Sequence, residues 1–208
     1  MNYFPAFKPY INEDSISNIN SALNDLAISG NFGKSIEEVE YLYSKLHSNY
    51  EAVLCSSGTS ALHLACLALG VNAQSTVVVP ATTNMATFFA PIYCGAKVIP
   101  CDVNQENGLI SFNALDLICR NNKVDYVLPV HLYGHVVDPN ELKKLSSQYN
   151  FRVIEDCAEA HFASWDNNQK FVGSEFDAGC FSFYANKIIA CGEGGIVLFK
   201  NKKYGDIA

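Results

Sequence analysis

Seven short apolar runs divide the sequence, and they restrict its fold more than any other feature. They span residues 51–55, 75–80, 96–103, 124–133, 151–157, 179–184 and 194–199. Runs of this length, rich in β-branched and aromatic residues, are typical of buried strands. Helical patterns separate most of them, which favours a largely parallel sheet covered on both faces. A shorter connection joins the last two runs and also permits an antiparallel pair. We therefore predict one three-layer α/β/α domain with a mostly parallel seven-stranded sheet.

Helices are predicted from their terminal residues. The first helical pattern begins near Asp14 or Ser15 and stops at Gly30. Ser35 and Glu38 have the spacing of a capping box, which opens a helix by pairing side chains with free backbone N–H groups. Further helices are predicted for residues 58–69, which end before a glycine, and for the segment that follows Asp-Pro at 138–139.

Composition restricts the class of protein. The chain has 208 residues and a formal net charge of −7, from 14 basic and 21 acidic residues, which argues against nucleic acid or an acidic membrane as a partner. Its 8 cysteines form no C-x-x-C pair, and most lie in apolar runs, so we expect reduced structural thiols rather than disulfides. The amino terminus lacks the layout of a signal peptide, and no apolar run is long enough to span a membrane. We expect a cytoplasmic protein.

Residues 55–65 follow a strand and open a helix, an arrangement that can bind an anion. Free N–H groups at a helix start and the helix dipole attract phosphate. Gly58 allows close approach to the backbone, and the hydroxyls of Ser57, Thr59 and Ser60 add donors. An ordinary N-cap explains the same residues, so both interpretations stay open.

A second group of polar residues, at 153–161, ends a buried strand with Glu155 and Asp156 and continues to Glu159 and His161. A carboxylate at a strand end can keep the ring nitrogen of a heterocycle protonated through a charge-assisted hydrogen bond. Asp156 could instead cap a following helix. A metal site is a further alternative, but the spacing matches no strong ligand signature, and we expect no metal.

Lys187 stands between two apolar strands, before a glycine-rich turn. An isolated lysine after a strand is ordinarily solvated, but apolar neighbours on both sides favour a partly desolvated pocket, where a lysine amine becomes a nucleophile for aldehydes. Asn84 precedes a helix at another strand end, and His131 and His135 are second-rank candidates. Since ligands bind at the carboxyl ends of parallel strands, an anion cradle, an acid and a lysine there are the three groups that pyridoxal phosphate requires.

The sequence resembles the DegT/DnrJ/EryC1/StrS family of pyridoxal-phosphate-dependent sugar aminotransferases over about residues 28–200. Five blocks in the family's order carry the resemblance: SSGTSALHLACLALG, PVHLYGH, VIEDCAEAH, GCFSFYANKIIACGEGGIV and, more loosely, VVVPATTNMATFFAPIYCGAKVIPCDV. The second to fourth are most similar to the GDP-perosamine synthase branch. The resemblance implies transamination at C4 of a nucleotide-linked 4-keto-6-deoxy sugar, with glutamate as the expected amino donor, in amino-sugar biosynthesis for surface polysaccharide.

The resemblance also implies residue roles. Lys187 corresponds to the lysine that bonds to the cofactor aldehyde and then moves protons. Asp156 corresponds to the acid that pairs with the pyridinium nitrogen. Thr59, Ser60 and Ser182 correspond to residues that bind the cofactor phosphate. We therefore expect pyridoxal 5'-phosphate as the cofactor, with Gly58 also part of its site.

Glu159 agrees with the family pattern, and two other positions depart from it. Glu159 lies where the family has Gln, His or Glu near the cofactor 3-hydroxyl. Asn84 occupies the place of an aromatic residue that stacks on the cofactor ring, and Phe162 replaces a glycine after the histidine, which is expected to crowd the loop.

The expected domain organisation is a cofactor-binding large domain over residues 1–208, with N-terminal helices at 12–50 and a sheet domain at 51–200. The resemblance implies a smaller C-terminal domain, which we expect to be absent, and a homodimer with shared active sites. Two alternatives stay open: a catalytically incomplete, cofactor-binding or partner-dependent fragment, and a pyridoxal-phosphate-dependent sugar dehydratase. Related dehydratases carry histidine in place of the lysine, so Lys187 favours transamination.

Overall fold

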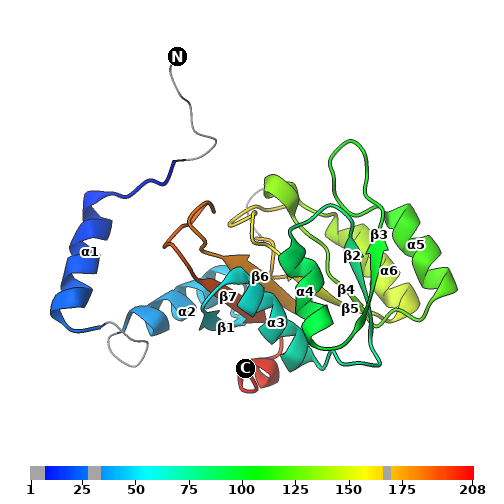
Figure 1. The fold of residues 1–208 in the computed structure, drawn as a ribbon, viewed down its shortest axis with the longest axis horizontal. Coiled ribbons are helices and arrows are strands. Elements are labelled where there is room, and N and C mark those ends of the chain that lie inside the picture. Colours follow the sequence, from blue (N-terminus) through cyan, green and yellow to red (C-terminus); the bar gives the residue numbers. More distant parts are fainter. Residues whose placement is uncertain (1–7, 28–33, 166–169) are drawn as a thin grey trace, which may run out of the picture.

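The computed structural model describes residues 8–27, 34–165 and 170–208, most of which surround a seven-stranded sheet (Figure 1). The strands lie in the order β1-β7-β6-β5-β4-β2-β3. β7 runs antiparallel to β1 and β6, and the remaining pairs are parallel. The predicted mostly parallel sheet is confirmed, and the shorter connection does join an antiparallel pair. The strands are β1 (Glu51–Cys55), β2 (Thr76–Pro80), β3 (Lys97–Cys101), β4 (Tyr126–Val127), β5 (Arg152–Asp156), β6 (Ala178–Ser182) and β7 (Gly195–Phe199).

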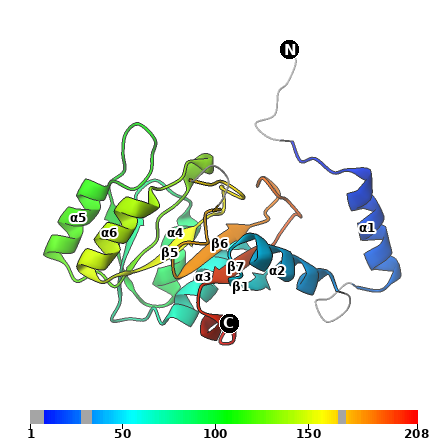
Figure 2. The same ribbon diagram turned by 180° about the vertical axis from the view of Figure 1, so that it is seen from behind.

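Helices cover both faces of the sheet. They are α1 (Glu13–Asn24), α2 (Ser35–Leu46), α3 (Gly58–Leu69), α4 (Met85–Tyr93), α5 (Phe112–Asn121), α6 (Pro139–Tyr149) and α7 (Lys202–Gly205), with a 3₁₀ turn, η1, at Leu132–Gly134. Figure 1 shows α3 and α4 in front of the sheet, and Figure 2 shows α2, α5 and α6 on the opposite face.

Side-chain alternation along the strands creates the two apolar layers. Val77 and Val79 of β2 pack into the layer that α3 and α4 cover, whereas Val78 packs with residues of α5 and α6. On β7, Ile196 and Leu198 join Tyr43 of α2 in a further cluster. Because successive strand residues point to opposite faces, an apolar strand fills both layers at once, and the predicted three-layer architecture is confirmed.

The ends of three predicted elements differ from expectation. α1 begins at Glu13, after an Asn12 cap that accepts from the Ser15 amide, and it ends at Asn24 rather than near Gly30, which lies outside the described residues. Leu26 already has a positive φ of 57°, which ends helical geometry. The run at 124–133 forms only the two-residue β4 and an isolated bridge from Val130 to Asp156, because Pro129 has no N–H to donate.

The capping box predicted at Ser35 is wrong. Lys34 precedes the helix with helical backbone angles, φ −102° and ψ −4°, and makes no side-chain cap. Ser35 is therefore already inside α2, where its side chain cannot act as an N-cap. The other predicted ends are confirmed, because Gly70 closes α3 in the left-handed region and the Asp138 side chain caps α6.

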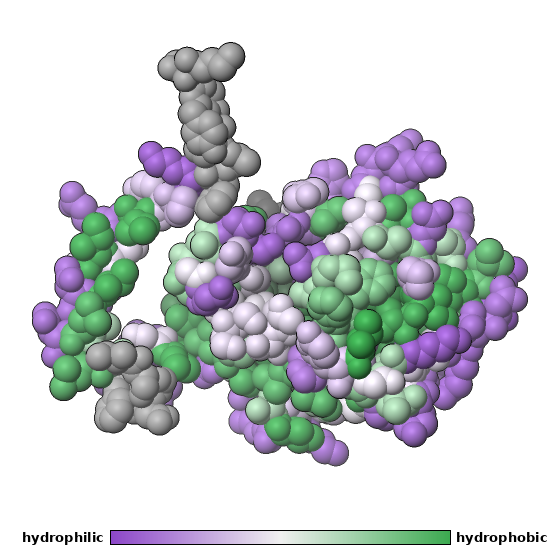
Figure 3. Space-filling model, viewed as in Figure 1, coloured by the Kyte–Doolittle hydropathy of each residue, from purple (hydrophilic) through white to green (hydrophobic). Residues whose placement is uncertain are grey.

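α1 lies away from the sheet in Figures 1 and 2, and none of its residues is buried. Its Ile16, Ile19 and Leu23 are all more than half exposed. Figure 3 shows apolar side chains along this helix, and on the right-hand part of the domain it shows hydrophilic residues along the rim around a hydrophobic area. None of the helices in the described ranges is both long enough and apolar enough to cross a membrane.

Candidate active site

A cavity of about 340 Å³ lies at the carboxyl edge of the sheet. Its volume is within the ~300–1,000 Å³ usual for small-molecule sites. Its walls come from four segments that follow β1, β2, β5 and β6. Six of the residues predicted from the sequence line it: Gly58, Thr59, Asn84, Asp156, Ser182 and Lys187. Lys187 and Asp156, 31 residues apart in sequence, therefore face the same space.

The start of α3 forms one wall of this cavity. Ser57 caps the helix, because its Oγ accepts from the Ser60 amide at 3.1 Å. The amides of Gly58 and Thr59 belong to the first turn, where N–H groups have no acceptor within the helix. The N-cap and the anion cradle are thus compatible. Ser60 lies outside the lining, and its hydroxyl contacts those of Ser57 at 2.9 Å and Ser56 at 3.0 Å.

Glycines bring the strands close to this helix start. A Cβ added at Gly58 would lie 2.7 Å from the Cβ of Ser182, at the end of β6. A Cβ at Gly195 would lie 2.3 Å from the carbonyl oxygen of Ser57. The room left by the second glycine is thus taken up by the backbone before α3 rather than by a ligand. Glycine at these positions places Ser182 directly beside the first turn of α3.

Asp156 ends β5 and is 4% exposed. Its Oδ2 accepts from the Thr87 hydroxyl at 2.7 Å, and its Oδ1 accepts from the Ala158 amide at 3.1 Å. Burial raises the pKa of Asp156 above its ordinary value, against the opposing effects of these two hydrogen bonds and of the Lys187 charge. A cation in the cavity would offset this burial. The carboxylate is therefore suited to pair with a protonated ring nitrogen.

Thr87 was missed by sequence reasoning, although it holds the central carboxylate. It is fully buried on α4, and its Oγ1 lies 2.7 Å from that of Thr83. A threonine four residues after another is a weak signal, and Thr83 lies just before the Asn84 cap of α4 rather than inside the helix. The interpretation of Asp156 as a helix cap is wrong, because a turn rather than a helix follows β5.

Lys187 is held by an ion pair. Its Nζ lies 3.1 Å from Oε1 of Glu159, and the two side chains are 14% and 27% exposed. The other oxygen of Glu159 accepts from the Tyr133 amide at 3.2 Å. Tyr133 has a positive φ of 50°, uncommon for a non-glycine residue. The ordinary solvated lysine is thus not what the structure shows: Lys187 is directed into the cavity by a carboxylate.

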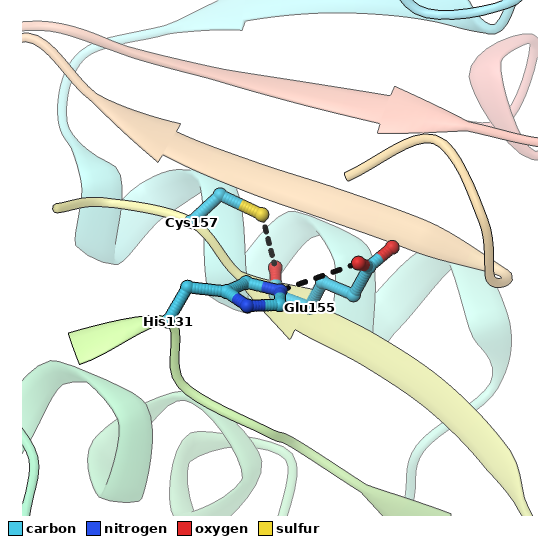
Figure 4. Close-up of side chains that lie close together, drawn as sticks. All are labelled: His131, Glu155 and Cys157. Carbon is cyan, nitrogen blue, oxygen red and sulfur yellow. Dashed lines mark hydrogen bonds and ion pairs between the residues drawn. The ribbon is translucent and has the colours of Figure 1, made fainter. Parts of the chain in front are cut away.

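A separate acidic cluster bears on the metal alternative. Nε2 of His131 lies 3.3 Å from Oε1 of Glu155, and the Cys157 thiol donates to the carbonyl of Glu155 (Figure 4). Nδ1 of His131 accepts from the Val137 amide at 3.2 Å, so Nε2 carries the proton of the neutral ring. The nitrogen nearest the carboxylate then has no lone pair for a metal ion. These groups form a buried hydrogen-bonded support beneath the site.

A model described as the DegT/DnrJ/EryC1/StrS aminotransferase family matches residues 9–208. The chain belongs to the DegT/DnrJ/EryC1/StrS aminotransferase family. The resemblance seen in the sequence is confirmed over nearly the whole chain.

Members of this aminotransferase family share its sequence and its fold. GDP-perosamine synthase of Escherichia coli O157:H7 is 35% identical over 206 residues, which cover 99% of this chain and 56% of the relative. The aminotransferase from Psychrobacter cryohalolentis superposes with a TM-score of 0.89 at 26% identity, covering 95% of this chain and 49% of that one. NtdA of Bacillus subtilis, solved with bound cofactor PMP, gives 0.81 at 25% identity, covering 98% and 47%. The chain thus spans about half the length of these relatives.

Pyridoxal phosphate is the cofactor of this aminotransferase family, and the cavity fits it. The first turn of α3 and Ser182 offer donors for a phosphate, Asp156 offers a buried carboxylate for the ring nitrogen, and Lys187 offers an amine. The sequence prediction missed Tyr184, Asn186 and Glu193, which also line the cavity. They lie on the connection from β6 to β7, as Lys187 does. The sequence alone does not show that this connection and the first turn of α3 line the same cavity.

The two departures from the family pattern have defined places. Asn84 caps α4, and its Oδ1 accepts from the Ala86 amide at 3.0 Å while the residue lines the cavity. Phe162 has a positive φ of 59°, the geometry that a glycine adopts without strain. Its ring packs against Tyr43, at 6.0 Å between centroids. The predicted crowding of this loop is therefore a backbone effect offset by aromatic packing.

Proposed function

We propose that this chain is the cofactor-binding part of a pyridoxal-phosphate-dependent aminotransferase that acts on a nucleotide-linked 4-keto-6-deoxy sugar, with glutamate as amino donor. One observation carries the proposal: Lys187, Asp156 and the first turn of α3 line a single cavity of about 340 Å³. GDP-perosamine synthases among the relatives support a nucleotide-linked sugar as the substrate, and we propose a role in amino-sugar biosynthesis for surface polysaccharide.

Each proposed role follows from the contacts of one residue. When bound, pyridoxal phosphate supplies an electron-withdrawing ring that stabilises negative charge on the carbon losing a proton. Asp156 keeps the ring nitrogen protonated, since a buried carboxylate gains most from a cationic partner. The amides of Gly58 and Thr59 and the hydroxyl of Ser182 bind the phosphate. Asn84, which lines the same cavity, would contribute to holding the ring.

Lys187 would hold the cofactor through its aldehyde, with release of water, and its Nζ would then serve as the acid and base that carries a proton. Its Nζ must be neutral to do so, and Glu159 accepts its hydrogen bond at 3.1 Å in the charged state. Glu159 therefore aims the amine while the cavity is open. We assign Glu159 the place near the cofactor 3-hydroxyl, where the carboxylate would exchange its contact with the amine for one with the hydroxyl.

The remaining parts of the proposal concern the whole protein. Residues 1–208 form the large domain, with helices at 12–50 and the sheet at 51–200. The relatives are about twice as long, and we propose that a smaller domain and a second copy of the chain complete the sugar pocket. The protein is proposed to work in the cytoplasm as a homodimer. Ser60 is proposed to support the phosphate through Ser57 rather than by direct contact.

Trapping the cofactor on its lysine tests the proposal. Protein incubated with pyridoxal phosphate and then reduced with borohydride should carry one cofactor mass on the peptide that contains Lys187. Lys187→Ala should lose the label. Lys200→Ala is the matched control, because Lys200 is exposed and its side chain donates to the Glu175 carbonyl at the opposite edge of the sheet. Label on other lysines, or none, would contradict the proposal.

Glutamate separates catalysis from binding alone. A competent chain should release one 2-oxoglutarate per bound cofactor in a single turnover. Label on Lys187 without 2-oxoglutarate would favour the cofactor-binding fragment. Loss of water from a 4-keto sugar, without transfer of nitrogen, would favour the dehydratase.

A further inference from the structure

Three buried groups connect α2 to the proposed phosphate site. The Tyr43 hydroxyl lies 2.9 Å from Nδ1 of His161, and Nε2 of the same ring lies 2.7 Å from the carbonyl oxygen of Ser182. Their exposed fractions are 6%, 5% and 5%. Tyr43 and His161 are 118 residues apart in sequence. This arrangement plays no part in the chemistry assigned above.

The direction of both hydrogen bonds is fixed by one acceptor. A carbonyl oxygen can only accept, so Nε2 of His161 donates to Ser182. Nδ1 of the neutral ring then has a lone pair, and the Tyr43 hydroxyl donates to it. Burial lowers the pKa of His161, which keeps this single-proton form, and burial raises the pKa of Tyr43. The hydroxyl therefore remains a donor at neutral pH.

The Ser182 carbonyl needs this donor because the neighbouring strand has ended. β5 pairs with β6 only as far as Asp156 opposite Cys180, and the next amide, that of Cys157, donates to the Cys180 carbonyl. Two residues farther on, the Ser182 carbonyl extends beyond the end of β5. His161, from the loop after β5, supplies a donor where no strand amide is present.

The opposite side of Ser182 is fixed as well. Gly58 lies so close that an added Cβ would approach the Ser182 Cβ at 2.7 Å. The Ser182 hydroxyl oxygen accepts from the Tyr184 amide at 3.3 Å, which leaves its hydrogen to be donated. Ser182 is thus held through its carbonyl, its Cβ and its Oγ, beside the free amides of α3.

Aromatic packing prevents the His161 ring from turning. Its centroid lies 5.4 Å from that of Phe183 in a stacked arrangement, and 5.2 Å from that of Phe181. Phe183 and Phe181 also contact the Tyr43 ring. The orientation of the Ser182 carbonyl therefore depends on how α2 packs against β6 and β7.

We infer that Tyr43 and His161 are positioning residues that orient Ser182 toward the phosphate group of the cofactor. This rests on the proposed function, because it assigns Ser182 to a phosphate. The effect should be confined to ligands that carry the phosphate. A purely structural role would change binding of the phosphorylated and unphosphorylated cofactor alike.

The test compares pyridoxal phosphate with pyridoxal, which lacks the phosphate. Tyr43→Phe removes only the hydroxyl, and we expect the affinity for pyridoxal phosphate to fall about tenfold, as for loss of one buried hydrogen bond. Affinity for pyridoxal should change by less than about twofold, because pyridoxal lacks the phosphate that Ser182 is proposed to bind. Tyr50→Phe is the matched control: Tyr50 is also 6% exposed, and its hydroxyl donates to the Phe176 carbonyl, away from the cavity.

Two variants at His161 separate donation from packing. His161→Gln keeps an N–H donor for the Ser182 carbonyl and should retain part of the preference for pyridoxal phosphate. His161→Leu removes the donor and should lose it. An equal loss of both ligands in Tyr43→Phe, or no loss, would overturn the inference while leaving the proposed function intact.

Inorganic phosphate gives an independent readout. Binding to the cofactor-free protein, followed by ³¹P NMR, should be weaker in Tyr43→Phe than in the wild type and unchanged in Tyr50→Phe. If the wild type fails to attach cofactor to Lys187 but binds phosphate in this pattern, the proposed function fails and the positioning role stands. If the wild type binds neither ligand, both fail.

Discussion

The buried carboxylate of Asp156 is expected to lower the stability of the cofactor-free protein while favouring a cationic ligand. The side chain is 4% exposed, and burial raises its pKa above the ordinary 3.8. Between that value and the raised pKa, the folded chain binds more protons than the unfolded chain. Stability must therefore fall as pH rises through this window. A cationic ring nitrogen in the cavity would remove that penalty.

Asp156→Asn should reveal this dependence in the cofactor-free protein. Asparagine does not titrate, so the free energy of unfolding of the variant should increase relative to that of the wild type as pH rises from below 3.8. Urea denaturation at a series of pH values measures the difference. A difference that stays constant with pH would show that the buried carboxylate carries no such penalty.

Asp125→Asn is the opposite control. Although burial acts to raise it, the Thr76 amide and the Lys123 ammonium hold the pKa of Asp125 below its ordinary value. Here the folded state favours the charged form, so the contribution is present above pH 3.8 and is lost as pH falls. The free energy of unfolding of the wild type should therefore increase relative to that of Asp125→Asn as pH rises.

Residues that line the cavity were predictable from their place near strand ends, whereas buried residues whose partners are distant in the chain were not. Lys187 and Asp156 were found because a cation and an acid at strand ends are unusual. Thr87 was missed because its acceptor lies 69 residues away, and Tyr43 because its partner lies 118 residues away. No local pattern reports such pairs, since only the folded sheet brings them together.

The close contact between α3 and the end of β6 is possible because Gly58 has no side chain. Gly58→Ala places a Cβ 2.7 Å from that of Ser182, so one element must move. We expect a loss of about 1–3 kcal/mol in the free energy of unfolding and weaker binding of pyridoxal phosphate. Adding Ser182→Gly removes the opposing Cβ and should restore part of the stability but not the binding. A fully stable, cofactor-binding Gly58→Ala protein would show that the contact is not tight.

Helix ends were predictable where the backbone geometry or the capping hydrogen bond at that position favours one type of residue. Gly70 closes α3 because only glycine takes the left-handed region without strain, and Asp138 caps α6 with its own side chain. Ser35 failed because a capping box also requires extended backbone at the first serine, and Lys34 is already helical. Phe162, noted in place of a glycine, does take positive φ.

Across the whole molecule, the eight cysteines are free, as expected from their place in apolar runs. Cys191 is exposed, Cys55 and Cys94 are half-buried, and the others are buried. Burial raises the pKa of Cys101 to about 12 and that of Cys119 to about 11, so both remain protonated and unreactive at neutral pH.

Titration with a thiol reagent should follow this order. In the native protein Cys191 should react first, and Cys191→Ser should remove the fast phase. In denaturant all 8 thiols should react, whereas fewer would indicate a disulfide. Fast reaction of Cys101 in the native protein would contradict the packing of the layer beneath α5.

The reversed direction of β7 has a practical consequence for handling the protein. After the loop that holds Lys187, this strand carries the polypeptide back to the opposite edge of the sheet, where the Tyr204 ring lies 5.0 Å from the guanidinium of Arg152, the first residue of β5. A fluorophore or affinity tag fused at Ala208 would therefore be separated from the cavity by the length of the strands. Immobilising residues 1–208 through a tag at that position should leave the cavity mouth open to small molecules supplied from solution.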